Sequence, residues 1–315
     1  MKSYASLLYT PALLLASVAR PGRVRADILV LDLEDSIHPA RKAEARALLA
    51  QKDLDLTGAG LPALGLRVTT IATPDGLADL QALIEMDATI GGVPVDVVFI
   101  PKISGPGDVA IYRSLLSHTT NPPQICSFIE TVDAVDNAVG IAAVSDGLCF
   151  GQADLTADLY AENAFYLDHA RAQLCAAAAK YRIPAIDTNS FELHDLDVVA
   201  EQCRAARDAG FTGKAAIHPR QVDTIAETFT VSPEKIAEYR SVVEDYNSTP
   251  YGFAVEEDRV LAPPFVLRAQ RMLQLHAPAT ATATATATAG NAGTPATAGT
   301  PRTPGTANTR TSNAK

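Results

Sequence analysis

The chain has 315 residues, of which 47% are hydrophobic and 20% charged, a composition typical of a globular protein with a sizeable core. Its 36 acidic and 26 basic residues give a formal net charge of −10, which disfavours nucleic acid and anionic membranes as partners. No stretch approaches the ~18 to 20 uninterrupted apolar residues of a membrane span. Four widely spaced cysteines without a CxxC pair indicate reduced thiols and a cytoplasmic location.

Short apolar runs alternate with longer helix-like stretches, the pattern of βα units around a parallel sheet. Strands are expected at residues 6–10, 27–33, 64–69, 95–102, 124–130, 147–151, 183–188 and 213–219. Helices are expected between them, including residues 39–50, 76–86, 107–117, 132–144, 163–181 and 195–210. Eight strands with intervening helices over ~250 residues predict a TIM (β/α)₈ barrel, with a doubly wound sheet as the alternative.

The composition changes abruptly at residue 277, where Ala, Thr, Pro and Gly with a few basic residues replace the mixed sequence. Such a segment cannot bury a core. We therefore expect a barrel domain over residues 1–276 and a disordered, solvated tail over residues 277–315.

Polar side chains gather at the expected carboxyl ends of the strands, the face at which TIM-barrel active sites lie. The run "ILVLDLEDS" ends in Asp32, Glu34 and Asp35, three carboxylates in four positions. For Asp32 we expect an ordinary polar strand end, whereas buried carboxylates at 34 and 35 would need partners. The remaining strand-end residues of this kind are Arg67, Lys102, Glu130, Asp154, Asp187, Asn189 and His218.

Two of these carboxylates suggest a metal site. Glu130 and Asp154 each follow an apolar run, with one helix-like stretch between them. Adjacent strands would bring them side by side, and like charges that close favour a bound cation. Oxygen ligands without His or Cys point to Mg²⁺, with Mn²⁺ as the alternative.

Two basic residues are expected to face the same bowl. Arg67 could clamp a substrate carboxylate or stabilise an enolate oxygen, or it could only neutralise Glu34 or Asp35 as a structural ion pair. Lys102, in "IPKI", is expected to bind substrate, with a structural ion pair again as the alternative. His218, before Pro219, is left out of the catalytic set.

Several segments resemble the citrate lyase β-subunit-like branch of the HpcH/HpaI aldolases, which contains citryl-CoA and malyl-CoA lyases. The segments are "ILVLDLEDSIHPARKAEAR", "LRVTT", "VVFIPKI", "ICSFIET", "LCFGQADLTADL", "GFTGKAAIHPRQV" and "GFAVEEDRVLAPPFVLRAQRML". The resemblance implies a (β/α)₈ homo-oligomer, trimeric or hexameric. It also implies that Glu130 and Asp154 are the Mg²⁺ carboxylates, that Arg67 binds substrate, and that Glu34 and Asp35 lie beneath the metal and bind its water.

The chemistry implied by this resemblance is Mg²⁺-dependent cleavage of a 3-hydroxyacyl-CoA into an acyl-CoA and a 2-keto acid. Two departures bear on it: Ala12 replaces the glycine of "LFVPG", and Ala262 replaces the aspartate of "DGKMVDAP", a proton carrier for a neighbouring subunit's site. Two alternatives therefore stay open. One is a metal-dependent aldolase acting on a free hydroxy-keto acid, and the other is a barrel that binds metal and acid without lyase turnover.

Overall fold

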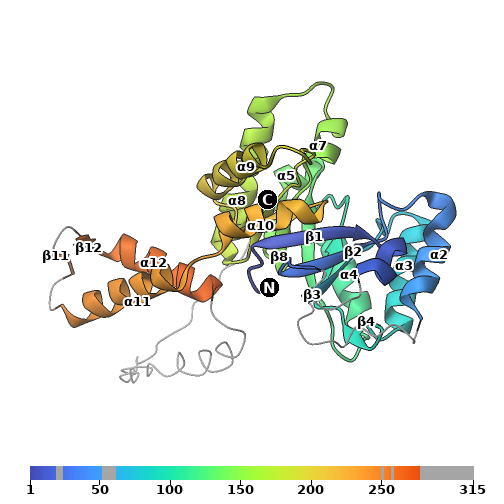
Figure 1. The fold of residues 1–315 in the computed structure, drawn as a ribbon, viewed down its shortest axis with the longest axis horizontal. Coiled ribbons are helices and arrows are strands. Elements are labelled where there is room, and N and C mark those ends of the chain that lie inside the picture. Colours follow the sequence, from blue (N-terminus) through green and yellow to red (C-terminus); the bar gives the residue numbers. More distant parts are fainter. Residues whose placement is uncertain (19–23, 52–61, 250–251, 257–258, 277–315) are drawn as a thin grey trace, which may run out of the picture. The chain divides into compact units, whose positions relative to one another are not determined.

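A computed structural model describes residues 1–18, 24–51, 62–249, 252–256 and 259–276 of the protein (Figure 1). Its centre is a closed barrel in the order β1-β10-β9-β8-β7-β6-β3-β2, with parallel pairing throughout. The strands are β1 (Ser6–Pro11), β2 (Ile28–Asp32), β3 (Ala63–Arg67), β6 (Val97–Ile100), β7 (Gln124–Ile129), β8 (Gly147–Phe150), β9 (Ala185–Asp187) and β10 (Gly213–Ala216). The TIM barrel is confirmed, each expected strand is present, and the doubly wound alternative is excluded.

Helices follow the strands as expected. They are α1 (Leu15–Val18), α2 (Lys42–Leu49), α3 (Pro74–Glu85), α4 (Pro106–Leu116), α5 (Val132–Asp136), α6 (Ala138–Ala142), α7 (Gln152–Asp158), α8 (Ala164–Tyr181), α9 (Leu196–Ala209) and α10 (Pro219–Phe229). Short-range chemistry sets their ends. For example, α9 begins where the Asp195 side chain accepts two backbone N–H groups and ends at Gly210, which has φ 109°.

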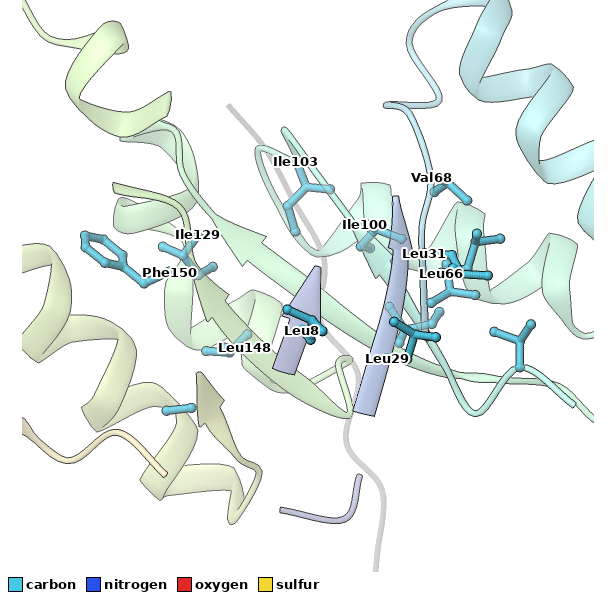
Figure 2. Packing of buried hydrophobic residues seen from close by; sticks show 14 of the residues in the cluster. Leu8, Leu29, Leu31, Leu66, Val68, Ile100, Ile103, Ile129, Leu148 and Phe150 are labelled. Carbon is cyan, nitrogen blue, oxygen red and sulfur yellow. The ribbon is translucent and has the colours of Figure 1, made fainter. Parts of the chain in front are cut away.

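The barrel strands divide their side chains between two hydrophobic clusters, because successive residues of a strand point to opposite faces. In β2, Leu29 and Leu31 belong to the cluster shared with the surrounding helices, part of which Figure 2 shows. Ile28 and Val30 belong to a second cluster, made almost entirely of barrel-strand residues, that fills the interior. The same alternation carries Asp32 to the interior side at the carboxyl end of β2.

The described part of the chain holds two further small sheets and two C-terminal helices. β4 (Thr89–Ile90) pairs with β5 (Val93–Pro94), and β11 (Ala254–Glu256) pairs with β12 (Arg259–Leu261), both antiparallel. α11 (Pro233–Ser248) packs against α12 (Pro263–Leu275).

Met1–Ala277 forms one compact unit, while the expected tail over residues 277–315 lies outside the described residues. Within the described ranges, no helix has both the length and the apolar character needed to cross a membrane. All four cysteines are buried and free of disulfides.

Candidate active site

Arg67 is fixed by Asp32, its register partner on the neighbouring strand. Arg67 Nε and Nη2 each donate a hydrogen bond of 2.7 Å to the Asp32 carboxylate, a bidentate charge-assisted pair. The guanidinium also lies 5.4 Å from the ring centre of Tyr9 and 5.8 Å from that of Phe128. Burial acts to raise the pKa of Asp32, but the hydrogen bonds and charge of Arg67 outweigh it and hold the pKa below its usual value. The expectation of an ordinary strand end was wrong for Asp32, which anchors the arginine.

Glu34 and Asp35 meet two cations rather than one. Arg67 Nη1 lies 3.0 Å from Glu34 Oε2, and Lys102 Nζ lies 2.8 Å from Glu34 Oε1, both at ion-pair distance. Lys102 Nζ also lies 3.2 Å from Asp35 Oδ1 and 3.5 Å from Asp154 Oδ1. Glu34 is only 3% exposed, and this burial raises its pKa to about 7 despite the two cations. Both basic residues therefore form the ion pairs that the sequence left open as alternatives.

Glu130 follows β7 and is almost fully buried. Its Oε1 accepts a hydrogen bond of 2.7 Å from the backbone N–H of Lys102, a residue in the left-handed conformation with φ 51°. Burial, followed by the negative charges of Glu34 and Asp154, raises the pKa of Glu130 to about 8. Gly151 makes room for this carboxylate, because a Cβ there would lie 2.2 Å from Glu130 Oε2.

These groups border a pocket of ≈ 380 Å³, within the usual range for a small-molecule site. Arg67, Glu130 and Asp154 line it together, so the structure brings the expected substrate-binding arginine and the two expected metal carboxylates to one place. Asp35 also lines the pocket, whereas Lys102 and Glu34 reach it only through their ion pairs. The other lining residues include the aromatic and apolar side chains of Tyr9, Phe128, Phe150, Phe191 and Ile217.

The carboxylates suit a metal that takes few protein ligands. Among the described residues, no group of three or more His, Cys, Asp or Glu is arranged to hold a metal ion. Mg²⁺ typically binds through one or two carboxylates and completes its shell with water and substrate oxygens. Glu130 has no ion pair within the described part of the chain, and burial together with the negative charges of Glu34 and Asp154 raises its pKa. The pair Glu130 and Asp154 therefore fits such an ion.

Three other strand-end residues have different surroundings. Asp187 does not line the pocket and instead takes ion pairs of 2.6 Å from both Arg171 and Lys214. Asn189 lines the pocket, and its Nδ2 is a buried atom that has no hydrogen-bond partner among the described residues. His218 accepts a backbone N–H at the start of α10, a structural role that agrees with leaving it out of the catalytic set.

A closed parallel barrel with carboxylates and an arginine gathered in one pocket at the carboxyl ends of its strands has the architecture of a TIM-barrel enzyme. The model of the family "HpcH/HpaI aldolase/citrate lyase" matches residues 5–219. The chain therefore belongs to the HpcH/HpaI aldolase/citrate lyase family and is an enzyme of the carbon–carbon lyase type, as the sequence motifs predict.

Three relatives illustrate this membership. RipC from Yersinia pestis is 33% identical, with a TM-score of 0.61 over 73% of this chain and 97% of RipC. CitE from Mycobacterium tuberculosis, solved with magnesium, acetoacetate and coenzyme A, is 26% identical, with a TM-score of 0.65 over 86% of this chain and 97% of CitE. The mitochondrial citramalyl-CoA lyase of Rattus norvegicus is 24% identical over 86% of this chain and 85% of its own length.

Proposed function

We propose that the protein is a Mg²⁺-dependent lyase that reversibly cleaves a 3-hydroxyacyl-CoA, such as citryl-CoA or malyl-CoA, into an acyl-CoA and a 2-keto acid. The observation that carries the proposal is the juxtaposition of an Asp32-anchored Arg67 with buried Glu130 and with Asp154 in one pocket. Two relatives support the choice of substrate class, since one was solved with magnesium and coenzyme A and the other is named for a CoA thioester.

Each residue then has a chemical task. Glu130 and Asp154 hold the metal, with Mn²⁺ as the alternative ion, and the ion when bound supplies positive charge to the oxygens of the acid. Arg67, which lines the pocket, binds a carboxylate of the substrate. Lys102 and Glu34 keep Asp154 and Arg67 in position through their ion pairs.

Cleavage breaks one carbon–carbon bond and involves two proton transfers. The 3-hydroxyl loses its proton, the bond between carbons 2 and 3 breaks, and the electron pair of that bond becomes the enolate of the acyl thioester. The former hydroxyl carbon becomes the carbonyl of the 2-keto acid, and the enolate takes up a proton to give the acyl-CoA. The fixed positive charge of Arg67 stabilises the negative charge that develops.

Ala262 favours a second candidate function. It precedes α12 and has no proton to exchange, so the proton transfers of thioester chemistry fall to other groups. Of its acidic neighbours in sequence, Glu257 and Asp258 lie outside the described residues. Aldol cleavage of a free hydroxy-keto acid needs no thioester enolate, and a barrel that binds metal and acid without turnover is the third candidate.

A cleavage assay separates the three. Citryl-CoA, malyl-CoA and free 4-hydroxy-2-keto acids are each supplied with Mg²⁺ or with EDTA to the wild type, to Glu130→Gln and to the exposed control Glu227→Gln. Thioester cleavage that EDTA and Glu130→Gln abolish, and that Glu227→Gln keeps, is the expected result. Cleavage of free acids alone would establish the aldolase, and Mg²⁺ binding without any cleavage would establish the third candidate.

We further propose that residues 1–276 form the catalytic domain of a cytoplasmic homo-oligomer, a trimer or hexamer. The compact unit Met1–Ala277 and the four free, buried cysteines support the domain and the reducing compartment. A chain truncated after Ala277 should keep full activity and the oligomer mass of the complete protein in light scattering. Loss of either would assign a role to residues 278–315.

A further inference from the structure

Two apolar side chains at the pocket face solvent instead of the core. Phe191 is 74% exposed and Ile217 is 39% exposed, and both line the pocket. Phe191 lies between β9 and α9, and Ile217 directly follows β10. We call these two residues the apolar lip. Because both contact the pocket and solvent, the lip stands where a ligand would pass from one to the other.

One buried side chain holds both residues of the lip. Gln221, which is 0% exposed, donates from Nε2 to the carbonyl oxygens of Ser190 at 2.9 Å and Glu192 at 2.8 Å, one on each side of Phe191. Its Oε1 accepts the N–H of Ile217 at 3.0 Å. A fully buried amide thus fixes the backbone around an exposed phenylalanine.

Further hydrogen bonds fix the rest of this segment. Lys214 Nζ donates to the carbonyl oxygen of Thr188 at 2.7 Å, and Glu192 Oε1 accepts the N–H groups of His194 and Asp195. A preorganised surface loses little conformational entropy when a ligand covers it, so its contacts count fully toward affinity. The fold therefore presents Phe191 in a fixed place.

We propose that the apolar lip is the contact surface for the carrier part of the substrate, the chain and base of coenzyme A that extend out of the pocket. This inference rests on the proposed thioester lyase function and names the residues that recognise the thioester. The charged groups in the pocket suit the acid, while the lip offers nothing to a short polar acid. A carrier with an aliphatic arm and an aromatic base covers such a surface.

Equilibrium binding to the full-length protein tests the inference, with free coenzyme A as one probe and acetoacetate plus Mg²⁺ as the other. Phe191→Ser should weaken coenzyme A binding about tenfold, the order expected for an aromatic contact, and leave acetoacetate binding unchanged. Phe191→Trp, which keeps a flat apolar surface, should retain the affinity. Phe165→Ser is the matched control, because Phe165 is 86% exposed and does not line the pocket.

The outcomes separate the inference from the function on which it rests. Equal coenzyme A affinity in the wild type and Phe191→Ser would overturn the role of the lip alone. Acetoacetate binding without coenzyme A binding in the wild type would overturn both the lip and the thioester substrate. Binding of neither probe would overturn the proposed function itself. Repeating the titration with pantetheine shows which part of the carrier Phe191 contacts, since a matching loss assigns the aliphatic arm and no loss assigns the nucleotide.

Discussion

Replacing Asp32 with Asn tests whether the Asp32–Arg67 pair holds the site together. Asn keeps the shape of the side chain, but it can accept only one of the two hydrogen bonds that Arg67 donates at 2.7 Å. Asp32 also accepts the backbone N–H groups of Glu34 at 2.9 Å and Ser36 at 3.2 Å, so the acidic segment loses part of its anchor.

The expected cost follows from the burial of the pair. Removing one partner of a buried ion pair typically costs about 3–5 kcal/mol of unfolding free energy. We expect about 3 kcal/mol, the lower end of that range, because Arg67 is 14% exposed and keeps its 3.0 Å ion pair with Glu34. A guanidinium displaced by an ångström should also lower kcat/KM by about 10²-fold.

Urea unfolding measures the loss of unfolding free energy, which should appear as a lower urea midpoint with an unchanged dependence of that free energy on urea concentration. Asp223→Asn is the control, since Asp223 and Arg25 form an ion pair with side chains 57% and 75% exposed, a kind worth at most about 1 kcal/mol. If Asp32→Asn destabilises the protein no more than the control does, the Asp32–Arg67 pair does not hold the site together.

Three further changes probe the surroundings of the site. Gly151→Ala places a Cβ 2.2 Å from Glu130 Oε2, so calorimetry should show weaker Mg²⁺ binding. Urea unfolding should show that the free energy of unfolding falls by about 1–3 kcal/mol. Gly107→Ala is the control, because the space around its new Cβ is open and the protein should not be destabilised. Because burial raises the pKa of Glu130 from 4.5 to about 8, the metal-free native state keeps a proton that the unfolded chain releases. Its unfolding free energy should therefore fall as pH rises between these values, and an unchanged slope in Glu130→Gln would contradict this origin. Lys214→Met leaves buried Asp187 with one cation instead of two, so urea unfolding should show a loss of about 3 kcal/mol, and a loss below 1 kcal/mol would contradict that role.

The barrel could be predicted because its strands are buried on both faces and therefore read as continuous apolar runs. β2 and β6 are buried at every position. The division of the expected helix at 132–144 was not predictable in the same way. The break falls at Asn137, whose side-chain amide donates to the carbonyl oxygen of Ser104 at 2.9 Å. That partner is distant in sequence, so no local pattern identifies it.

The candidate site could be predicted only in part, because strand ends show which charges gather but not which ones pair. The sequence offered Glu34 and Asp35 as partners of Arg67, yet the bidentate partner is Asp32. Register decides the choice, since Asp32 lies opposite Arg67 between β2 and β3. The alternation of side chains along the strand, counted from Ile28, would have placed Asp32 on the interior side. The position of Asp32 opposite Arg67 depends on how β2 and β3 pair in the folded barrel, which the sequence of either strand does not show. Exposure of Phe191 is also tertiary, because an isolated aromatic residue in sequence is more often part of the core.

The crowded carboxylates after β2 make physical sense once their partners are counted. The described residues at the site supply two cations, Arg67 and Lys102, against five carboxylates: Asp32, Glu34, Asp35, Glu130 and Asp154. Asp32 accepts two hydrogen bonds from Arg67, and the pKa of Asp32 is lowered. The pKa values of Glu34 and Glu130 are instead raised, to about 7 and about 8. Near neutral pH the site can relieve its negative excess by holding protons or by binding a divalent cation. Because a metal ligand must be deprotonated, protons and a divalent cation compete for Glu130, and cation binding should strengthen as pH rises toward the raised pKa of this carboxyl.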